Sequence, residues 1–171
     1  MEAMNNLLER RSIRKYSDRQ VEQELLDQVL EAGLYAASGM NSQVSVMVAV
    51  TDKETRDQLS KMNAAVMGAE NDPFYGAPCV IVVLGDPERY TWVEDGSLVM
   101  GNLMNAAHAL GLGSCWIHRA RQMFDSEEGK ALLKKWGLPE TLQGVGNCIL
   151  GYSAEDPTPK PRREGRIVKV L

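Results

Sequence analysis

The sequence has 171 residues, 44% of them hydrophobic and 25% charged, with a formal net charge of −4. These values predict one folded domain over residues 1–171 and exclude the disordered, collagen-like and coiled-coil classes. No apolar run reaches the roughly 18 residues of a membrane span, and the negative charge argues against general binding to nucleic acid. The three cysteines are far apart and no secretion signal is evident, so we expect a cytoplasmic location.

The predicted elements follow from hydrophobic spacing, capping residues and turn signals. In chain order we predict helix 3–11, helix 19–37, strand 44–50, helix 51–67, strand 79–84, helix 94–110, strand 114–117, helix 125–136 and strand 144–152. This alternation favours an α/β or α+β sandwich around a small sheet.

Some of these elements carry more detailed expectations. Leu7 and Leu8 should face inward from the first helix. Two capping-box pairs should begin the second and third helices, namely Ser17 with Gln20 and Thr51 with Glu54. The continuous β-branched run at 79–84 predicts a strand buried on both faces, and helix 94–110 is apolar nearly all round, which predicts a core or subunit-interface helix.

The end of the chain has a different pattern. Pro157, Pro159 and Pro161 predict a stiff, extended arm that reaches across another part of the structure, for which a partner subunit is one candidate. Weak alternation of apolar residues at 166–171 predicts a last strand after the arm.

Ten of the nineteen basic residues lie in two short segments, 10–19 and 160–169. If the chain ends meet, as they often do in a domain, an acidic protein would carry one concentrated cationic site. Arginine side chains with a serine hydroxyl suit an organic phosphate, although no glycine-rich phosphate loop is present. Two separate, solvated charge runs are an equally simple interpretation.

Two further segments could contact a ligand. Asn41 and Gln43 carry donors and acceptors that match the edge of a heterocycle, although ordinary turn residues would give the same pattern. Cys115 and His118 have the spacing of half a metal site, but no second pair completes it, so we predict no metal. No catalytic side chain is evident, which fits a reaction carried by a cofactor.

Together these segments resemble the FMN-dependent nitroreductase family. The resemblance rests on five stretches in the family's order, which are 10–18, 38–43, 72–83, 111–117 and 151–166. It implies an α+β fold, a three-layer α-β-α sandwich whose small mixed sheet is flanked by helices, and a homodimer with FMN at the interface. In that arrangement the C-terminal arm reaches to the dimer partner.

The resemblance also implies roles for individual residues. Arg10, Lys160 and Arg162 would neutralise the FMN phosphate, Arg14 would lie nearer the flavin edge, and Asn41 would bond the isoalloxazine. The segment from Trp116 would run past the flavin face. The residues assigned to FMN in this way are Arg10, Arg11, Ser12, Arg14, Ser38, Gly39, Asn41, Gln43, Trp116, Ile117, His118, Lys160 and Arg162.

The activity implied is an oxidoreductase that takes hydride from NAD(P)H and reduces a nitroaromatic, a quinone or a similar electron-poor acceptor. Two alternatives remain open. One is a specialised FMN enzyme, dehalogenase-like or flavin-modifying, and the other is a non-catalytic flavin carrier or sensor. This sequence has Val44-Ser45 where the family commonly has Pro-Trp, and its lid region is short.

Overall fold

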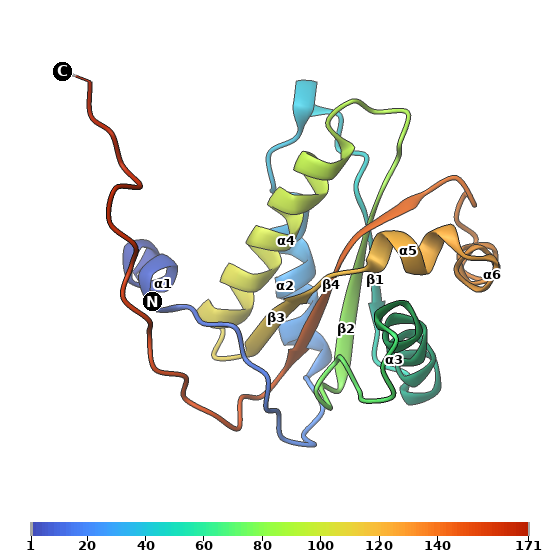
Figure 1. Ribbon diagram of the computed structural model, residues 1–171, viewed down its shortest axis with the longest axis horizontal. Coiled ribbons are helices and arrows are strands. Elements are labelled where there is room, and N and C mark those ends of the chain that lie inside the picture. Colours follow the sequence, from blue (N-terminus) through green and yellow to red (C-terminus); the bar gives the residue numbers. More distant parts are fainter. Residues whose placement is uncertain (1, 171) are drawn as a thin grey trace.

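The computed structural model describes residues 2–170, and Figure 1 shows a small sheet with helices on both faces. The helices and strands have the following bounds: α1 Ala3–Glu9, α2 Gln23–Leu34, the 3-10 turn η1 Gly39–Asn41, β1 Val46–Val50, α3 Lys53–Met67, β2 Cys79–Gly85, α4 Trp92–Ala109, β3 Gly113–Ile117, α5 Ala120–Asp125, α6 Glu127–Lys135 and β4 Gln143–Gly151. No helix in this part of the chain is long and apolar enough to cross a membrane.

The sheet has the strand order β1-β2-β4-β3, and every neighbouring pair is antiparallel. The expectation of a mixed sheet is therefore wrong for the strands, and the parallel contact recorded is a single bridge between Ser12 and Ser114. Alternating strands and helices do not fix strand direction here. The connection 68–78 is long enough for the chain to enter β2 from the opposite end.

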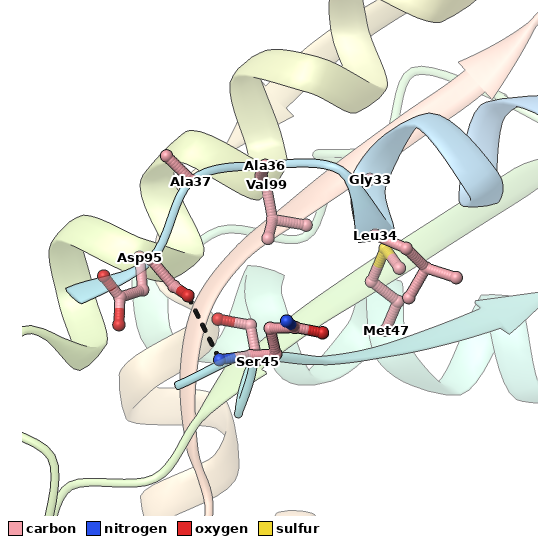
Figure 2. Close-up of a pocket in the computed structure, with 10 residues that line it drawn as sticks. Gly33, Leu34, Ala36, Ala37, Ser45, Met47, Asp95 and Val99 are labelled. Atoms are coloured by element: carbon pink, nitrogen blue, oxygen red, sulfur yellow. Dashed lines mark hydrogen bonds between the residues drawn. The ribbon is translucent and has the colours of Figure 1, made fainter. Parts of the chain in front are cut away.

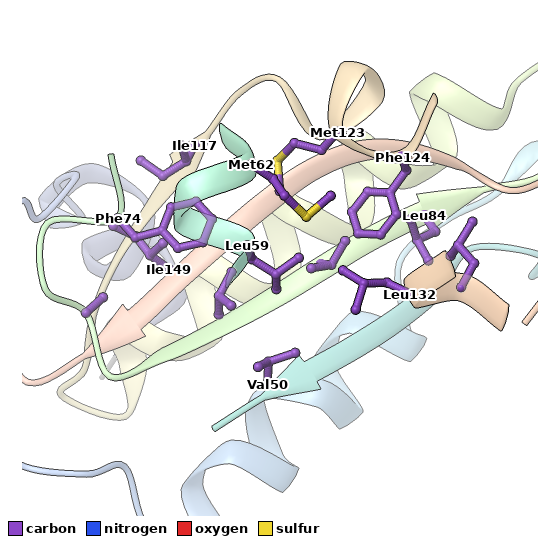
Figure 3. Packing of buried hydrophobic residues seen from close by; sticks show 14 of the residues in the cluster. Val50, Leu59, Met62, Phe74, Leu84, Ile117, Met123, Phe124, Leu132 and Ile149 are labelled. Atoms are coloured by element: carbon purple, nitrogen blue, oxygen red, sulfur yellow. The ribbon is translucent and has the colours of Figure 1, made fainter. Parts of the chain in front are cut away.

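The three-layer arrangement is confirmed by two buried clusters on opposite faces of the sheet. Side chains of α2 and α4 pack on one face, and side chains of α3, α5 and α6 pack on the other. Figure 3 shows the second cluster, with Leu59, Met123 and Phe124 over the strands. All seven residues of β2 are buried, and residues 79–84 alternate between the two clusters, so the prediction of a doubly buried strand is confirmed.

Two helix starts differ from the predicted capping boxes. Helix α2 begins at Gln23 after an N-cap, Glu22, that makes no side-chain capping bond. The preceding residues pair with the end of β4 instead, where the Ser17 N–H donates to the Tyr152 carbonyl over 3.0 Å. Helix α3 is capped by Asp52, which accepts from the Thr55 N–H at 2.8 Å, one residue later than predicted.

The predicted helix 125–136 is confirmed as α6, and the short helix α5 that precedes it was not predicted. The Ser126 hydroxyl accepts from the Gly129 N–H at 3.1 Å and caps α6. A Cβ on Gly129 would lie 2.1 Å from the Met123 carbonyl oxygen, so this glycine allows α5 and α6 to approach closely.

Neither chain end packs as predicted. Leu7 and Leu8 are 57% and 65% exposed, because α1 contacts α4 through Asn6, whose Nδ2 donates to the Asn105 carbonyl at 3.0 Å. Residues 158–170 form an exposed arm without regular structure that runs away from the sheet (Figure 1), so the predicted last strand has no neighbour for 166–170. Residue 171 of that predicted strand lies outside the described residues.

Candidate functional site

Two groups of the predicted site residues lie at opposite ends of α4. The loop that carries Asn41 lies at the N-terminal end of this helix, and Arg10 and Arg11 lie at its C-terminal end near His108 (Figure 1). The rise of an α-helix separates Asp95 from His108 by about 20 Å along α4. The two sets therefore do not form one site within the chain.

The loop at residues 38–43 is held from inside by Asp95, which is 3% exposed. Its carboxylate accepts from the Gly39 N–H at 2.8 Å and from the Thr91 hydroxyl at 3.0 Å. A Cβ on Gly39 would lie 2.4 Å from the Thr91 hydroxyl oxygen, so this contact requires glycine. A buried carboxylate is stable only when it accepts hydrogen bonds. Asp95 therefore holds the start of the loop in place beside α4.

The loop itself has an unusual backbone. Met40, Asn41 and Gln43 have φ angles of 54°, 54° and 50°, a region that side chains other than glycine rarely occupy. The Gln43 N–H donates to the Ser38 hydroxyl at 3.1 Å, and the Gln43 amide donates to Asn41 Oδ1 at 2.9 Å. These bonds present the Asn41 and Gln43 amides as one exposed unit.

A pocket of about 160 Å³ lies behind this loop, between α2, β1 and α4. Figure 2 shows Asp95, Ala37, Ser45 and Met47 around it. Gln43 and Ser38 also line this space. The pocket places the buried carboxylate directly behind the segment predicted to contact a heterocycle.

The other end of α4 borders a cleft of about 290 Å³ whose lining includes Arg10, Arg11, His108 and Ser114, together with the exposed Glu9 and Asp156 and the half-buried Glu155. Arg11 donates from Nη1 to the Leu8 and Arg10 carbonyls at 2.7 and 2.8 Å. Four buried side-chain atoms here have no hydrogen-bond partner among the described residues: Arg10 Nη1, Arg11 Nε, His108 Nε2 and Ser114 Oγ. Buried donors without acceptors are rare and costly, so this cleft is suited to an anion.

The backbone of the cationic motif is fixed to its surroundings. Ile13 is buried, and its N–H donates to the Ser114 carbonyl at 3.0 Å, while Ser12 forms the bridge to Ser114. The Arg14 N–H donates to the Glu155 carboxylate, and the Arg14 side chain is exposed. Ser12 and Arg14 therefore stand on a rigid segment beside the start of the arm.

Lys160 and Arg162 are exposed on the arm, whereas the lining of the cleft ends at Pro157, just before the arm begins. No ion pair engages Arg10, Arg11, Arg14, Lys160 or Arg162 within residues 2–170. These five side chains thus form no ion pair among the described residues, whereas Arg19 of the N-terminal segment pairs with Glu22, and the fold of one chain does not bring the two segments together.

The segment from Trp116 to His118, at the end of β3, does not present a row of exposed side chains. Trp116 is half-buried and packs near Met100 and Gly146, where a Cβ would lie 2.8 Å from the indole. Ile117 is buried on the opposite face, and His118 is exposed. Their contact with a cofactor stays a prediction.

The cysteines lie in the core rather than at these clefts. Cys79, Cys115 and Cys148 are all free and buried. Burial raises the pKa of the Cys79 thiol to about 12, and burial likewise raises the pKa of Cys148. These two thiols are protonated at neutral pH and are poor nucleophiles. Cys115 is buried whereas His118 is exposed, so that pair does not share a surface.

Sequence reasoning missed Asp95 and His108 as parts of the two clefts. Asp95 follows Glu94 in the first turn of α4, where acidic residues are common because they favour the helix dipole. His108 is one lone histidine on a long helix. Neither residue has a local pattern that distinguishes it, because its partners lie far away in the sequence.

Comparisons with known proteins are consistent across the chain. The profile of the nitroreductase family matches residues 7–73 and 65–152. An Archaeoglobus fulgidus protein, named provisionally as an NADH dehydrogenase/NAD(P)H nitroreductase, is 35% identical over 91% of this chain and 87% of its own length. The FMN reductase [NAD(P)H] of Bacillus subtilis is 26% identical over 94% of this chain and 70% of its own.

Solved structures agree with the sequence matches. The crystal structure of a nitroreductase with bound FMN from Bacteroides fragilis covers 100% of both chains with a TM-score of 0.90 and 28% identity. A nitroreductase with bound FMN from Desulfitobacterium hafniense also covers 100% of both chains, with a TM-score of 0.89 and 27% identity.

Proposed function

The chain belongs to the nitroreductase family, and we propose that it is an FMN-dependent oxidoreductase that uses NAD(P)H to reduce an electron-poor acceptor such as a nitroaromatic or a quinone. The observation that carries this proposal is the cleft with buried, unpartnered nitrogens of Arg10 and Arg11. The names of the relatives and the FMN bound in similar structures support the same activity.

The residues present fit FMN. Arginine gives a phosphate short, charge-assisted hydrogen bonds, and a phosphate would supply the acceptor that Arg10 Nη1 and Arg11 Nε lack. Ser12 and Arg14 lie beside this cleft on a fixed backbone. At the other end of α4, the joined amides of Asn41 and Gln43 offer both a donor and an acceptor to a heterocycle.

We further propose a homodimer in which each FMN site takes residues from both chains. Helix α4 separates the Asn41 loop from the Arg10 cleft, so a second copy must supply the missing half. Exposed apolar side chains on α1 and α4 support such an interface, because Leu7, Leu8 and Leu98 are 57%, 65% and 50% exposed. Within a dimer the exposed arm can carry Lys160 and Arg162 to a phosphate.

FMN, when bound, supplies two-electron chemistry between the nicotinamide and the acceptor. The chain's own residues then bind, orient and balance charge. Arg10, Lys160 and Arg162 would neutralise the phosphate, and the segment from Trp116 to His118 and the Asn41 loop would hold the ring so that two flat substrates can bind over it in turn. Arg14, which the resemblance places nearer the flavin edge, would favour negative charge on the ring by electrostatic attraction.

The three free, buried cysteines support a further proposal, a cytoplasmic location, because reducing compartments keep thiols unpaired.

The test is the visible spectrum of the purified protein before and after anaerobic addition of NADH or NADPH. Flavin bands that bleach on addition are expected. Flavin bands that persist would favour a carrier or a specialised flavin enzyme. A colourless protein that does not take up added FMN would overturn the proposal.

A further inference from the structure

The turn that joins β3 to α5 has a strained backbone. Arg119, the N-cap of α5, has φ 75° and ψ 4°, a left-handed conformation that favours glycine. This turn directly follows Trp116 and Ile117, and it includes His118. A non-glycine residue in this conformation persists only when its surroundings fix it.

Two buried asparagines supply that fixation. Asn63 of α3 is fully buried, and its Nδ2 donates to the His118 carbonyl at 2.7 Å while its Oδ1 accepts from Arg119 Nε at 2.9 Å. Asn147 of β4, also fully buried, donates from Nδ2 to the Ile117 carbonyl at 3.3 Å. Both ends of the Asn63 amide therefore hold consecutive residues of the turn.

The location of Asn63 is otherwise apolar. It lies one turn from Leu59, which Figure 3 shows in the same buried cluster as Met123. The Asn63 Nδ2 is 3.2 Å from the Met123 sulfur. Burying an amide costs free energy unless it is bonded, and an aliphatic side chain would pack here without that requirement. The polar group at this position thus serves the turn rather than the core.

We propose that Asn63 is a positioning residue that fixes the His118–Arg119 backbone at the flavin. This inference rests on the proposed function, because it places the segment from Trp116 to His118 along the cofactor. Asn63 itself does not touch the cofactor. It acts from the opposite side of the segment, through the His118 carbonyl and the Arg119 side chain.

The first test compares Asn63→Ala with Leu59→Ala, a matched truncation one turn away in the same core. Both variants should lose thermal stability, but only Asn63→Ala should speed hydrogen exchange of the amides at 117–123 in the FMN-free protein. That measurement does not depend on the cofactor. Equal exchange in the two variants would overturn the proposal, and it would do so even if the protein binds no flavin.

The second test measures the loaded enzyme in rapid mixing with saturating NAD(P)H. Misplacement of a positioned group slows a reaction about 10- to 100-fold, so flavin reduction should slow by that factor in Asn63→Ala and by less than about twofold in Leu59→Ala. FMN affinity should change little in either variant, because it depends on the cations proposed to bind the phosphate. A wild-type protein without flavin would overturn the proposed function, whereas equal rates in the two variants would overturn only the role of Asn63.

The third test uses Arg119. Arg119→Gly removes the left-handed strain and Arg119→Ala keeps it, while both remove the bond to Asn63. We expect Arg119→Gly to restore part of the lost rate when combined with Asn63→Ala, and Arg119→Ala to restore none. If the two double variants have the same rate of flavin reduction, the turn needs no fixation, and the proposal is contradicted.

Discussion

The two ends of α4 differ in how far the chain completes them. At the N-terminal end, Asp95 accepts bonds from Gly39 and Thr91 and holds the Asn41 loop from within the fold. At the C-terminal end, the cleft of Arg10 and Arg11 keeps unpartnered donors, and Lys160 and Arg162 stay exposed on an arm. One half-site is organised by the chain alone, and the other is the half that, in the dimer we propose, a ligand and a second chain would complete.

The largest effect is expected when the two halves of the site are inactivated in different chains. Neither Arg10→Ala nor Asn41→Ala homodimers should contain an intact site. In mixed dimers one site carries both changes and the other carries none, so refolding the two variants together should restore about a quarter of the wild-type sites. Flavin-dependent activity of the mixture measures this recovery. If both halves of a site come from one chain, no recovery will be seen.

The next effect concerns the phosphate alone. A hydrogen bond to a charged group contributes about 1.5–3 kcal/mol, so Arg10→Ala or Arg162→Ala should weaken FMN binding roughly 10- to 100-fold. Riboflavin, which lacks the phosphate, should lose much less affinity, and fluorescence titration with both ligands measures the difference. An equal loss for both ligands would remove these arginines from the phosphate site.

A smaller effect is expected at the organised end. Asp95→Ala leaves the Gly39 N–H and the Thr91 hydroxyl without an acceptor, which should lower the free energy of unfolding by about 1–3 kcal/mol. The flavin spectrum should broaden as the Asn41 loop loses its place, while Asp95→Asn, which keeps an acceptor oxygen, should preserve more of both. Thermal unfolding and the visible spectrum are the measurements. If Asp95→Ala has the stability and the flavin spectrum of the wild type, Asp95 does not hold the Asn41 loop, and the two ends of α4 do not differ as described.

The smallest effect concerns the junction between residues 19–22 and β4. Hydrogen bonds from the Tyr152 hydroxyl and Arg19 lower the pKa of Glu22 from 4.5 to about 2. A lowered pKa gives stability that is present above the unfolded value and lost as pH falls from about 4.5 toward 2. Thermal unfolding of the wild type should therefore decline over this range more than that of Glu22→Gln. Equal declines in the wild type and in Glu22→Gln would show that the ionised Glu22 adds no stability.

The sequence predicts the elements whose signals are local. The β-branched run of β2, buried on both faces, and the long apolar α4 follow from the order of residues alone. Strand direction does not, because the same alternation fits a parallel or an antiparallel sheet. Helix α5 was missed because its N-cap, Arg119, makes no capping bond and gives no local start signal.

The candidate site shows the same limit. The residues of the cationic motif and the Asn41 loop form short, recognisable patterns, so they could be found in advance. Asp95 and Asn63 act across 56 and 55 residues of sequence, on Gly39 and on His118 respectively. No local pattern marks such residues, because their roles exist only once the chain has folded.

The exposed arm has a consequence for how the protein is handled in dilute solution. Residues 158–170 have no cover within one chain, and they include Lys160 and Arg162. If a second subunit covers them, cofactor retention and resistance of the tail to proteases will both rise with protein concentration, as mass action requires. Trypsin clipping of the tail would then report the same equilibrium as loss of yellow colour on dilution.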